Sequence, residues 1–350
     1  MLDVMRFWLD KGVDGFRVDV MWHMIKDELL RDNPKNPDYS PAMPTYEQLL
    51  PVYSTDQPEV HGVVKRMREL LDSYEERMMI GEIYLPIHKL VSYYGTDSDG
   101  AHLPFNFMLL NMPWNAARIA SAIDEYEGAL PSDGWPNWVL SNHDQPRITS
   151  RVGTSQARIA AMLLLTLRGT PTIYYGDEIG MKDVPIPFDE VKDPQGLNMP
   201  DKNLSRDPAR TPMQWDRSAY SGFSEVKPWL RIDKSYLREN VEVQQEDAYS
   251  MLQLYKRLIA LRQQKVSLLA GNYEPVYSDQ QMIAYIRHAP GADRFLVLLN
   301  LTHRPCYFRA LHDTLKGVVV LGSSPELEGL VFNNSFNLSG DEGIIVRLDQ

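Results

Sequence analysis

Residues 15–19 read Gly-Phe-Arg-Val-Asp, and this stretch decides the fold that the sequence predicts. Apolar and polar side chains alternate in it, as they do in a β-strand, where successive side chains point to opposite faces of the sheet. Phe16 and Val18 therefore face one side, and Arg17 and Asp19 face the other. In a barrel of parallel strands the apolar side packs against outer helices, so Arg17 and Asp19 point inward near the carboxyl end of the strand.

Two later segments repeat the arrangement of an acid after an apolar run. Glu82 follows a short apolar strand pattern, and Asp144 ends the polar group Ser-Asn-His-Asp at residues 141–144. Roughly 60 residues separate each carboxylate from the next, about the length of two βα units with inserted loops. Because the carboxyl ends of barrel strands share one face, the sequence predicts that Asp19, Glu82 and Asp144 converge there.

The chain alternates helix and strand patterns up to about residue 268 and shows strand patterns alone after it. Apolar residues at helical spacing predict helices at residues 1–11, 21–31, 58–71, 114–127, 155–167 and 248–264. Apolar runs predict strands at residues 13–20, 78–80, 102–110, 135–140 and 171–175, and then at 282–287, 294–301, 318–321 and 343–348. The predicted fold class is α/β, with a partial (β/α)8 TIM barrel in residues 1–268 and an antiparallel β-sandwich domain in residues 269–350. Five βα strands are predicted, whereas a closed barrel has eight.

The composition is that of a globular protein, since 43% of the 350 residues are hydrophobic and 24% are charged. The formal net charge is −11 without a long basic run, which argues against a nucleic-acid partner and favours a neutral substrate. The single cysteine, Cys306, excludes an intramolecular disulfide and agrees with a reducing, cytoplasmic location. The longest apolar run, residues 159–165, is too short to span a membrane, and a signal-peptide pattern is absent. The sequence does not indicate an oligomeric state.

The acids and the arginine suit glycosidic bond cleavage, which needs two opposed carboxyl groups. Arg17 beside Asp19 favours the charged carboxylate and fixes its orientation, as a nucleophile requires. Glu82 lies among apolar residues, which raise the pKa of its carboxyl group, as a general acid requires. A retaining mechanism predicts about 5–5.5 Å between the two carboxyl groups. The simpler interpretations remain open: Asp19 as a helix cap and Glu82 as a partly exposed glutamate.

Two further polar segments carry groups that can hold a sugar. Asn142, His143 and Asp144 can bind hydroxyl groups, although the same residue types favour turns. A metal site there is disfavoured, because no second histidine lies nearby at ligand spacing. The long polar segment of residues 179–245 contains Arg206-Asp-Pro-Ala-Arg-Thr-Pro-Met-Gln-Trp215, in which guanidinium groups and an indole suit hydroxyl groups and a sugar ring. A loop of this length in a compact protein is usually functional.

Together these segments closely resemble the α-glucosidase branch of glycoside hydrolase family 13, the α-amylase family. Residues 15–19 resemble the family's nucleophile segment on the fourth barrel strand, and residues 81–84 resemble its acid/base segment on the fifth. Residues 142–144 and 169–178 resemble the segments on the seventh and eighth strands, and the run at 210–215 is typical of α-glucosidases. The resemblance covers nearly the whole chain and implies strands 4–8 of the barrel followed by the family's β-sandwich.

The resemblance assigns three catalytic and three substrate-binding residues: Asp19 as nucleophile, Glu82 as acid/base, Asp144 as the acid that binds and distorts the sugar, and Arg17, His143 and Arg210 as substrate-binding residues. It implies retaining hydrolysis of α-glucosidic bonds at the non-reducing end of short oligosaccharides or disaccharides, without a cofactor. The alternatives are a related glucosyl transferase or isomerase of the sucrose- or trehalose-forming type, a non-catalytic interaction subunit, and an inactive fragment. Val20 stands where the family tends to tune α-1,4 against α-1,6 preference, but the sequence leaves the linkage open.

The family's first three barrel strands, an early Asp…Asn-His segment and a small inserted domain have no counterpart in this sequence. The resemblance implies that this part supplies further contacts to the sugar and, in many members, a divalent-ion site. We therefore expect an N-terminally truncated chain in which the strand at residues 13–20 forms an open edge. We expect residues 1–350 alone to be inactive and poorly soluble.

Overall fold

The computed structural model describes residues 1–310 and 314–349 of the chain. The chain forms two compact units. The first contains Met1–Phe107 and Glu125–Trp138, and the second contains Met108–Asp124 and Val139–Gln350.

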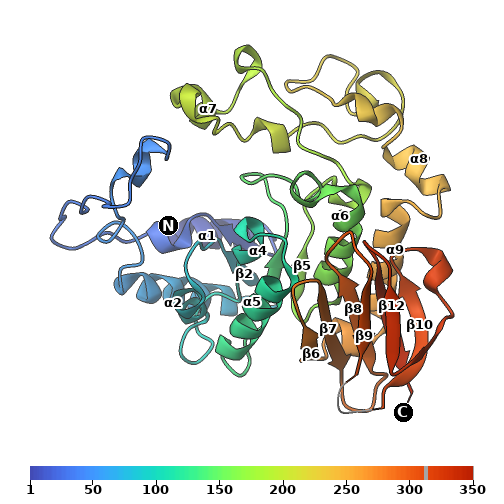
Figure 1. Ribbon diagram of the computed structural model, residues 1–350. Helices are drawn as coiled ribbons and strands as arrows, with labels where there is room; N and C mark the ends of the chain where they lie inside the picture. Colours follow the sequence, from blue (N-terminus) through green and yellow to red (C-terminus); the bar gives the residue numbers. More distant parts are fainter. Residues whose placement is uncertain (311–313, 350) are drawn as a thin grey trace. The chain divides into compact units, whose positions relative to one another are not determined.

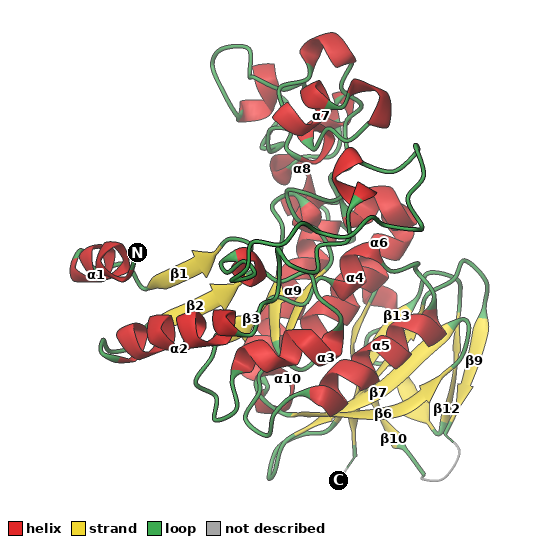
Figure 2. Cartoon of the chain, turned by 90° about the vertical axis from the view of Figure 1, so that its left-hand side faces the viewer, coloured by secondary structure: helices red, strands yellow, loops and turns green. Residues whose placement is uncertain are grey.

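The first unit contains a three-stranded parallel sheet in the order β1-β2-β3, whose strands lie side by side in Figure 2. The strands are β1 (Gly15–Val18), β2 (Met78–Gly81) and β3 (Leu103–Pro104). Val18 pairs with Gly81 at the end of the β1–β2 ladder. Asp19 and Glu82, the next residue along each strand, therefore follow neighbouring strand ends at the carboxyl edge of the sheet.

Two amphipathic helices of the first unit confirm the helices predicted at residues 1–11 and 58–71. They are α1 (Leu2–Asp10) and α2 (Glu59–Asp72), and α2 lies along the sheet in Figure 2. α1 buries Met5 and Leu9 and ends before Gly12, whose φ of 92° suits glycine. α2 follows Pro58 and buries one apolar face, made by Val60, Val64, Met67, Leu70 and Leu71.

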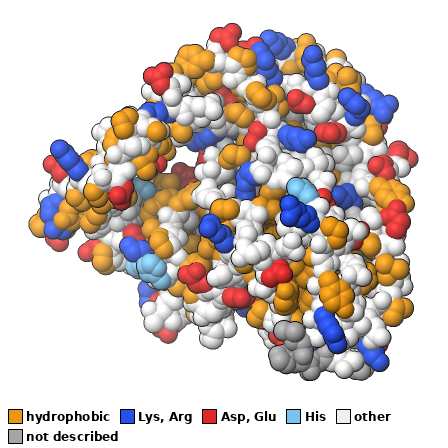
Figure 3. Space-filling view, in the orientation of Figure 1, with side chains coloured by type: hydrophobic (Ala, Val, Ile, Leu, Met, Phe, Trp, Pro, Cys, Tyr) orange, Lys and Arg blue, Asp and Glu red, His pale blue; other side chains and the backbone are white. Residues whose placement is uncertain are grey.

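The chain between β1 and α2 makes a long loop, and the helix predicted for residues 21–31 is wrong. A single 3-10 turn, η1 (Met21–His23), forms in that stretch, and η2 (Thr45–Gln48) lies further along. The Lys26 ammonium donates to the carbonyl of Ser54 (2.8 Å), and the Asp27 amide donates to the carbonyl of Tyr53 (2.8 Å). These bonds tie the segment to residues 53–54 and replace the helical ladder. Hydrophobic side chains are exposed on this loop (Figure 3): Leu29, Leu30, Tyr46, Leu49, Leu50 and Val52.

The strand predicted at residues 102–110 is wrong over most of its length. β3 ends at Pro104, which has no amide N–H to continue the ladder, and α4 (Met108–Asn111) follows soon after. The Phe105 amide still donates to the Gly81 carbonyl at the end of β2 (2.7 Å). The remaining helices of this region are α3 (Ile87–Leu90), η3 (Val91–Tyr94) and α5 (Ala116–Ala129), and α5 confirms the helix predicted at residues 114–127.

Two long helices of the second unit, α6 (Ile148–Thr166) and α9 (Met251–Gln264), confirm the predictions at residues 155–167 and 248–264. Arg262 of α9 donates to the carbonyls of Leu165 and Leu167 (both 2.9 Å), so it satisfies the C-terminal end of α6. The strand β4 (Asn137–Val139) confirms the strand predicted at residues 135–140, and β5 (Thr170–Thr172) confirms only the beginning of the strand predicted at residues 171–175. Among the described residues, every helix falls short of the length and apolarity needed to cross a membrane.

The segment that follows β5 is mostly loop, as predicted for residues 179–245. Its short elements are η4 (Asp177–Ile179), η5 (Phe188–Glu190), α7 (Pro194–Asn198), η6 (Pro200–Lys202), η7 (Asp207–Ala209), η8 (Ala219–Gly222), η9 (Lys234–Leu237) and α8 (Val241–Glu246).

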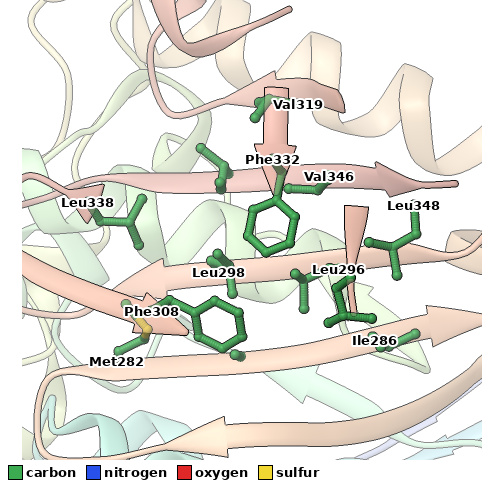
Figure 4. Close-up of a cluster of buried hydrophobic side chains, with 13 residues drawn as sticks. Met282, Ile286, Leu296, Leu298, Phe308, Val319, Phe332, Leu338, Val346 and Leu348 are labelled. Carbon is green, nitrogen blue, oxygen red and sulfur yellow. The ribbon is translucent and has the colours of Figure 1, made fainter. Parts of the chain in front are cut away.

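The C-terminal strands confirm the predicted antiparallel sandwich (Figure 1). After α10 (Val266–Leu269), one sheet has the order β11-β10-β13-β8-β7-β6, and β12 pairs with β9 in a second. The strands are β6 (Asn272–Ser278), β7 (Met282–His288), β8 (Phe295–Asn300), β9 (Cys306–Arg309), β10 (Lys316–Gly322), β11 (Val331–Asn333), β12 (Ser335–Leu338) and β13 (Gly343–Leu348), with the turn η10 (Pro325–Leu327). Phe308 of β9 and Leu338 of β12 share one buried cluster with Leu298 and Val346 of the larger sheet (Figure 4). The predicted domain boundary between residues 268 and 269 stays a prediction.

Candidate active site

An arginine joins the first two predicted acids at the carboxyl edge of the parallel sheet. The Arg17 guanidinium pairs through Nη1 with Asp19 Oδ1 and through Nη2 with Glu82 Oε2, the latter at 3.2 Å. The expected contact between Arg17 and Asp19 is thus confirmed. Because one planar guanidinium contacts both carboxyl groups, it holds them close together with their oxygens directed toward the same group.

The two carboxyl groups have opposite surroundings. The side chain of Asp19 is 76% exposed, whereas that of Glu82 is 5% exposed. Burial raises the pKa of Glu82, and the nearby charge of Asp19 raises it further, while the Val20 amide and the Arg17 charge lower it. One carboxylate is therefore open to attack an incoming group, and its neighbour is a carboxyl group that holds its proton to higher pH.

The backbone after Asp19 turns sharply to meet Glu82. Val20 has a φ of 38°, in the left-handed region that β-branched residues rarely adopt. Its amide donates to Glu82 Oε2 (2.8 Å), and the Met21 amide donates to the Glu82 carbonyl (3.0 Å). Gly81 leaves room for this approach, since a Cβ there would lie 2.6 Å from the Met21 sulfur. The sequence carries no signal for this turn, because valine does not favour a positive φ.

The third predicted acid lies in the second unit with both of its predicted neighbours. Asp144 Oδ1 accepts from Arg210 Nη2 (2.8 Å), and Asp144 Oδ2 lies 3.4 Å from His143 Nε2. Arg210 Nε also donates to the His143 carbonyl (2.7 Å). Asn142 forms the turn that its residue type favours, because its side-chain oxygen accepts from the Asp144 amide (3.0 Å). The turn and the polar cluster are therefore one structure.

Arg206 is a residue of this cluster to which the sequence analysis assigned no individual role. Its Nη1 donates to Asp144 Oδ1 (3.1 Å), beside the Arg210 bond to the same oxygen. The available signal is its spacing, four residues before Arg210 in the same polar run. Trp215 of that run is 49% exposed, so its indole is open to a ligand.

The six predicted residues thus form two groups. Arg17, Asp19 and Glu82 meet in the first unit, while the other three, His143, Asp144 and Arg210, meet in the second. The convergence of the two groups, and the separation of about 5–5.5 Å between the first two carboxyl groups, stay predictions. In residues 1–310 and 314–349, no three His, Cys, Asp or Glu side chains are grouped so that they could hold a metal ion.

The chain is similar to known proteins in sequence and in structure. The family described as alpha amylase, catalytic domain, matches residues 1–271. An alpha-glucosidase of Apis mellifera is 36% identical over 311 residues, which are 87% of this chain and 54% of that protein. The chain spans about half the length of the curated relatives it matches.

Two solved structures are similar over 99% of this chain. One is an alpha-glucosyl transfer enzyme, XgtA, with 29% identity, a TM-score of 0.89 and 66% of that chain covered. The other is the trehalulose synthase MutB from Pseudomonas mesoacidophila MX-45, with 26% identity, a TM-score of 0.86 and 67% of that chain covered.

Proposed function

This chain belongs to the alpha-amylase family, and on that premise we propose that the whole protein is a retaining α-glucosidase. It hydrolyses α-glucosidic bonds at the non-reducing end of short oligosaccharides or disaccharides. Similarity to an alpha-glucosidase over 87% of this chain supports the activity. The substrate is part of the proposal, because the chain spans about half the length of such relatives.

The observation that carries the proposal is the pair of carboxyl groups held by Arg17. Double displacement needs a charged carboxylate to attack the anomeric carbon and a protonated carboxyl group to release the leaving oxygen. Asp19 is exposed and paired with a cation, and burial raises the pKa of Glu82. The exposed, cation-paired position of Asp19 therefore suits a nucleophile, and the buried position of Glu82 suits a general acid, as is typical of paired carboxylates in glycosidases.

In the first step, the Asp19 carboxylate attacks the anomeric carbon and the bond to the leaving oxygen breaks. Glu82 transfers its proton to that oxygen, and a β-glucosyl ester on Asp19 results. In the second step, Glu82 takes a proton from water, the water oxygen attacks the same carbon, and the Asp19 carboxylate is released. Two inversions return the α configuration.

The second group supports the substrate in this proposal. Asp144 presents a charged carboxylate that accepts hydrogen bonds from sugar hydroxyls, and Arg210 and His143 hold it. Hydrogen bonds of this kind strengthen as the ring distorts toward the transition state. The proposal also includes a cytoplasmic location, supported by the single cysteine, Cys306.

A glucosyl transferase or isomerase is the second candidate function. Similarity to an alpha-glucosyl transfer enzyme and to a trehalulose synthase favours it, because the same glucosyl ester can react with a sugar hydroxyl in place of water. Incubation of the whole protein with maltose, and separately with sucrose, separates the two candidates. Free glucose in proportion to bonds cleaved supports hydrolysis, and new disaccharides or trisaccharides support transfer.

The whole protein is expected to release α-glucose as the first-formed anomer from α-glucosyl fluoride, a substrate that yields a single glucose for each bond cleaved. Retention follows from the two displacements at the anomeric carbon. Proton NMR of the anomeric signals, recorded before mutarotation equilibrates them, measures the outcome. A first-formed β-anomer would refute the double displacement and would leave single inversion by water as the mechanism.

Substituting Arg17 with alanine in the whole protein is expected to lower kcat by at least about 10²-fold, because the nucleophile loses its orientation. The charge of Arg17 lowers the pKa of Glu82, so its loss raises that pKa and moves the basic limb of the kcat/KM profile to higher pH. Arg66→Ala, at an exposed position of α2, is the matched control and should leave both unchanged. Near-normal turnover of the Arg17 variant would remove this residue from the mechanism.

A further inference from the structure

Arg206 joins two carboxylates of the second unit that are far apart in sequence. Its Nη1 donates to Asp144 Oδ1 (3.1 Å), whereas Nε and Nη2 donate to the two oxygens of Asp193 (2.9 and 2.6 Å). The Asp193 side chain is fully buried, with 0% exposure, and that of Arg206 is 30% exposed. One cation therefore connects a buried carboxylate of the long loop to the partly exposed carboxylate of Asp144.

The two side-chain hydrogen bonds from Arg206 to Asp193 fix the direction of Arg206 Nη1, the nitrogen that does not contact Asp193. A bidentate pair sets both the position and the plane of a guanidinium. The Arg206 amide donates to the same Asp193 oxygen (2.8 Å), which ties the backbone as well as the side chain. With three bonds to Asp193, Arg206 has little freedom, and its Nη1 is held toward Asp144.

Asp193 is itself anchored by backbone bonds at the base of the loop. The buried Asp207 accepts through Oδ2 from the amides of Lys192 (2.6 Å) and Asp193 (3.0 Å). Asp193 also caps α7, where its Oδ1 accepts from the Gln195 amide (3.3 Å). Residues 192–193 and 206–207 thus close the loop between them, so the position of Arg206 does not depend on the exposed residues in between.

We propose that Arg206 and Asp193 are positioning residues that fix the carboxylate of Asp144 for substrate binding. The inference rests on the proposed function, in which Asp144 binds and distorts the sugar. Arg206 acts through Asp144, and Asp193 acts through Arg206, so neither needs to touch the substrate. Charge alone does not replace this arrangement, because lysine has no planar fork to hold both carboxylates.

A double-mutant cycle in the whole protein tests the proposal, with α-glucosyl fluoride as substrate. Arg206→Met, Arg206→Lys and Asp193→Asn are each expected to lower kcat/KM by about 10²-fold, the cost of a small misplacement of a binding group. In an Asp144→Asn background, Arg206→Met should change kcat/KM by less than about threefold, because it acts through the residue already altered. Asp201→Asn, at an exposed position of the same loop, is the control and should behave as the parent protein.

The outcomes separate the two proposals. If the parent protein cleaves the fluoride but Arg206→Met costs the same factor in both backgrounds, Arg206 has a structural role and the positioning inference is overturned. Full activity of Arg206→Lys would also overturn the positioning inference, since a positive charge alone would then be enough to hold Asp144. If the parent protein does not turn over any α-glucoside, the proposed function fails and the positioning inference fails with it. Thermal unfolding of each variant shows whether a loss of activity reflects unfolding.

Discussion

Replacement of Asp19 with alanine in the whole protein is expected to lower turnover of maltose by at least about 10⁴-fold, because the reaction loses its covalent nucleophile. The side chain is 76% exposed, so its removal leaves no buried cavity and should cost little stability. Arg17 would keep its contact with Glu82 (3.2 Å). The loss should therefore appear in kcat, with the unfolding temperature close to that of the parent protein.

Azide provides a sharper measurement on the same variant. A small anion can occupy the space of the lost carboxylate and attack the anomeric carbon of an α-glucosyl fluoride in one displacement. The product should be the β-glucosyl azide, the opposite configuration to the α-glucose of the parent enzyme. Asp14→Ala, at a 95% exposed aspartate just before β1, is the matched control. Parent-like turnover by the Asp19 variant, or an α-azide product, would contradict the assignment.

The sequence predicted those parts of the fold whose signal is a repeated spacing. In α2, buried side chains recur along one face of the helix. In β1, the partly buried Phe16 and Val18 alternate with the exposed Arg17. The helix expected at residues 21–31 failed because Lys26 bonds to a carbonyl at residue 54, a partner that no local pattern reveals. The strands β6, β9, β11 and β12 were not predicted, since partners elsewhere in the sandwich, and not their own spacing, stabilise them.

The contacts of the site also divide into those that local spacing predicts and those that depend on distant residues. Arg17 could be placed beside Asp19 because residues two apart on a strand share a face, and the contact is present. Arg206 could not be placed beside Asp144 from the sequence, since the contact depends on hydrogen bonds that hold the Arg206 backbone and side chain to Asp193 across an irregular loop. Val20 is a second example, because its positive φ goes with the hydrogen bond from its amide to Glu82 and does not follow from its residue type.

The role of Glu82 depends on its surroundings more than on its residue type. Burial raises the pKa of its carboxyl group, and the Val20 amide and Arg17 oppose that rise. A raised pKa keeps the carboxyl group protonated, and so able to act as an acid, to higher pH. The basic limb of the kcat/KM profile should therefore report the loss of this proton, and activity should fall as the pH rises through the pKa of Glu82.

Glu82→Gln in the whole protein is expected to lower kcat/KM for maltose by about 10²–10⁴-fold, the usual contribution of a general acid. Glutamine has the same shape and can still accept from the Val20 amide, so the fold should be kept. The loss of kcat/KM in this variant should be much smaller for α-glucosyl fluoride, because fluoride leaves without a proton. The kcat/KM profile of the variant with that substrate should also lack the basic limb that Glu82 produces. Glu125→Gln, at an exposed position of α5, is the control. An equal loss on both substrates would show that Glu82 does not deliver the proton, and the two-carboxyl mechanism would then need another acid.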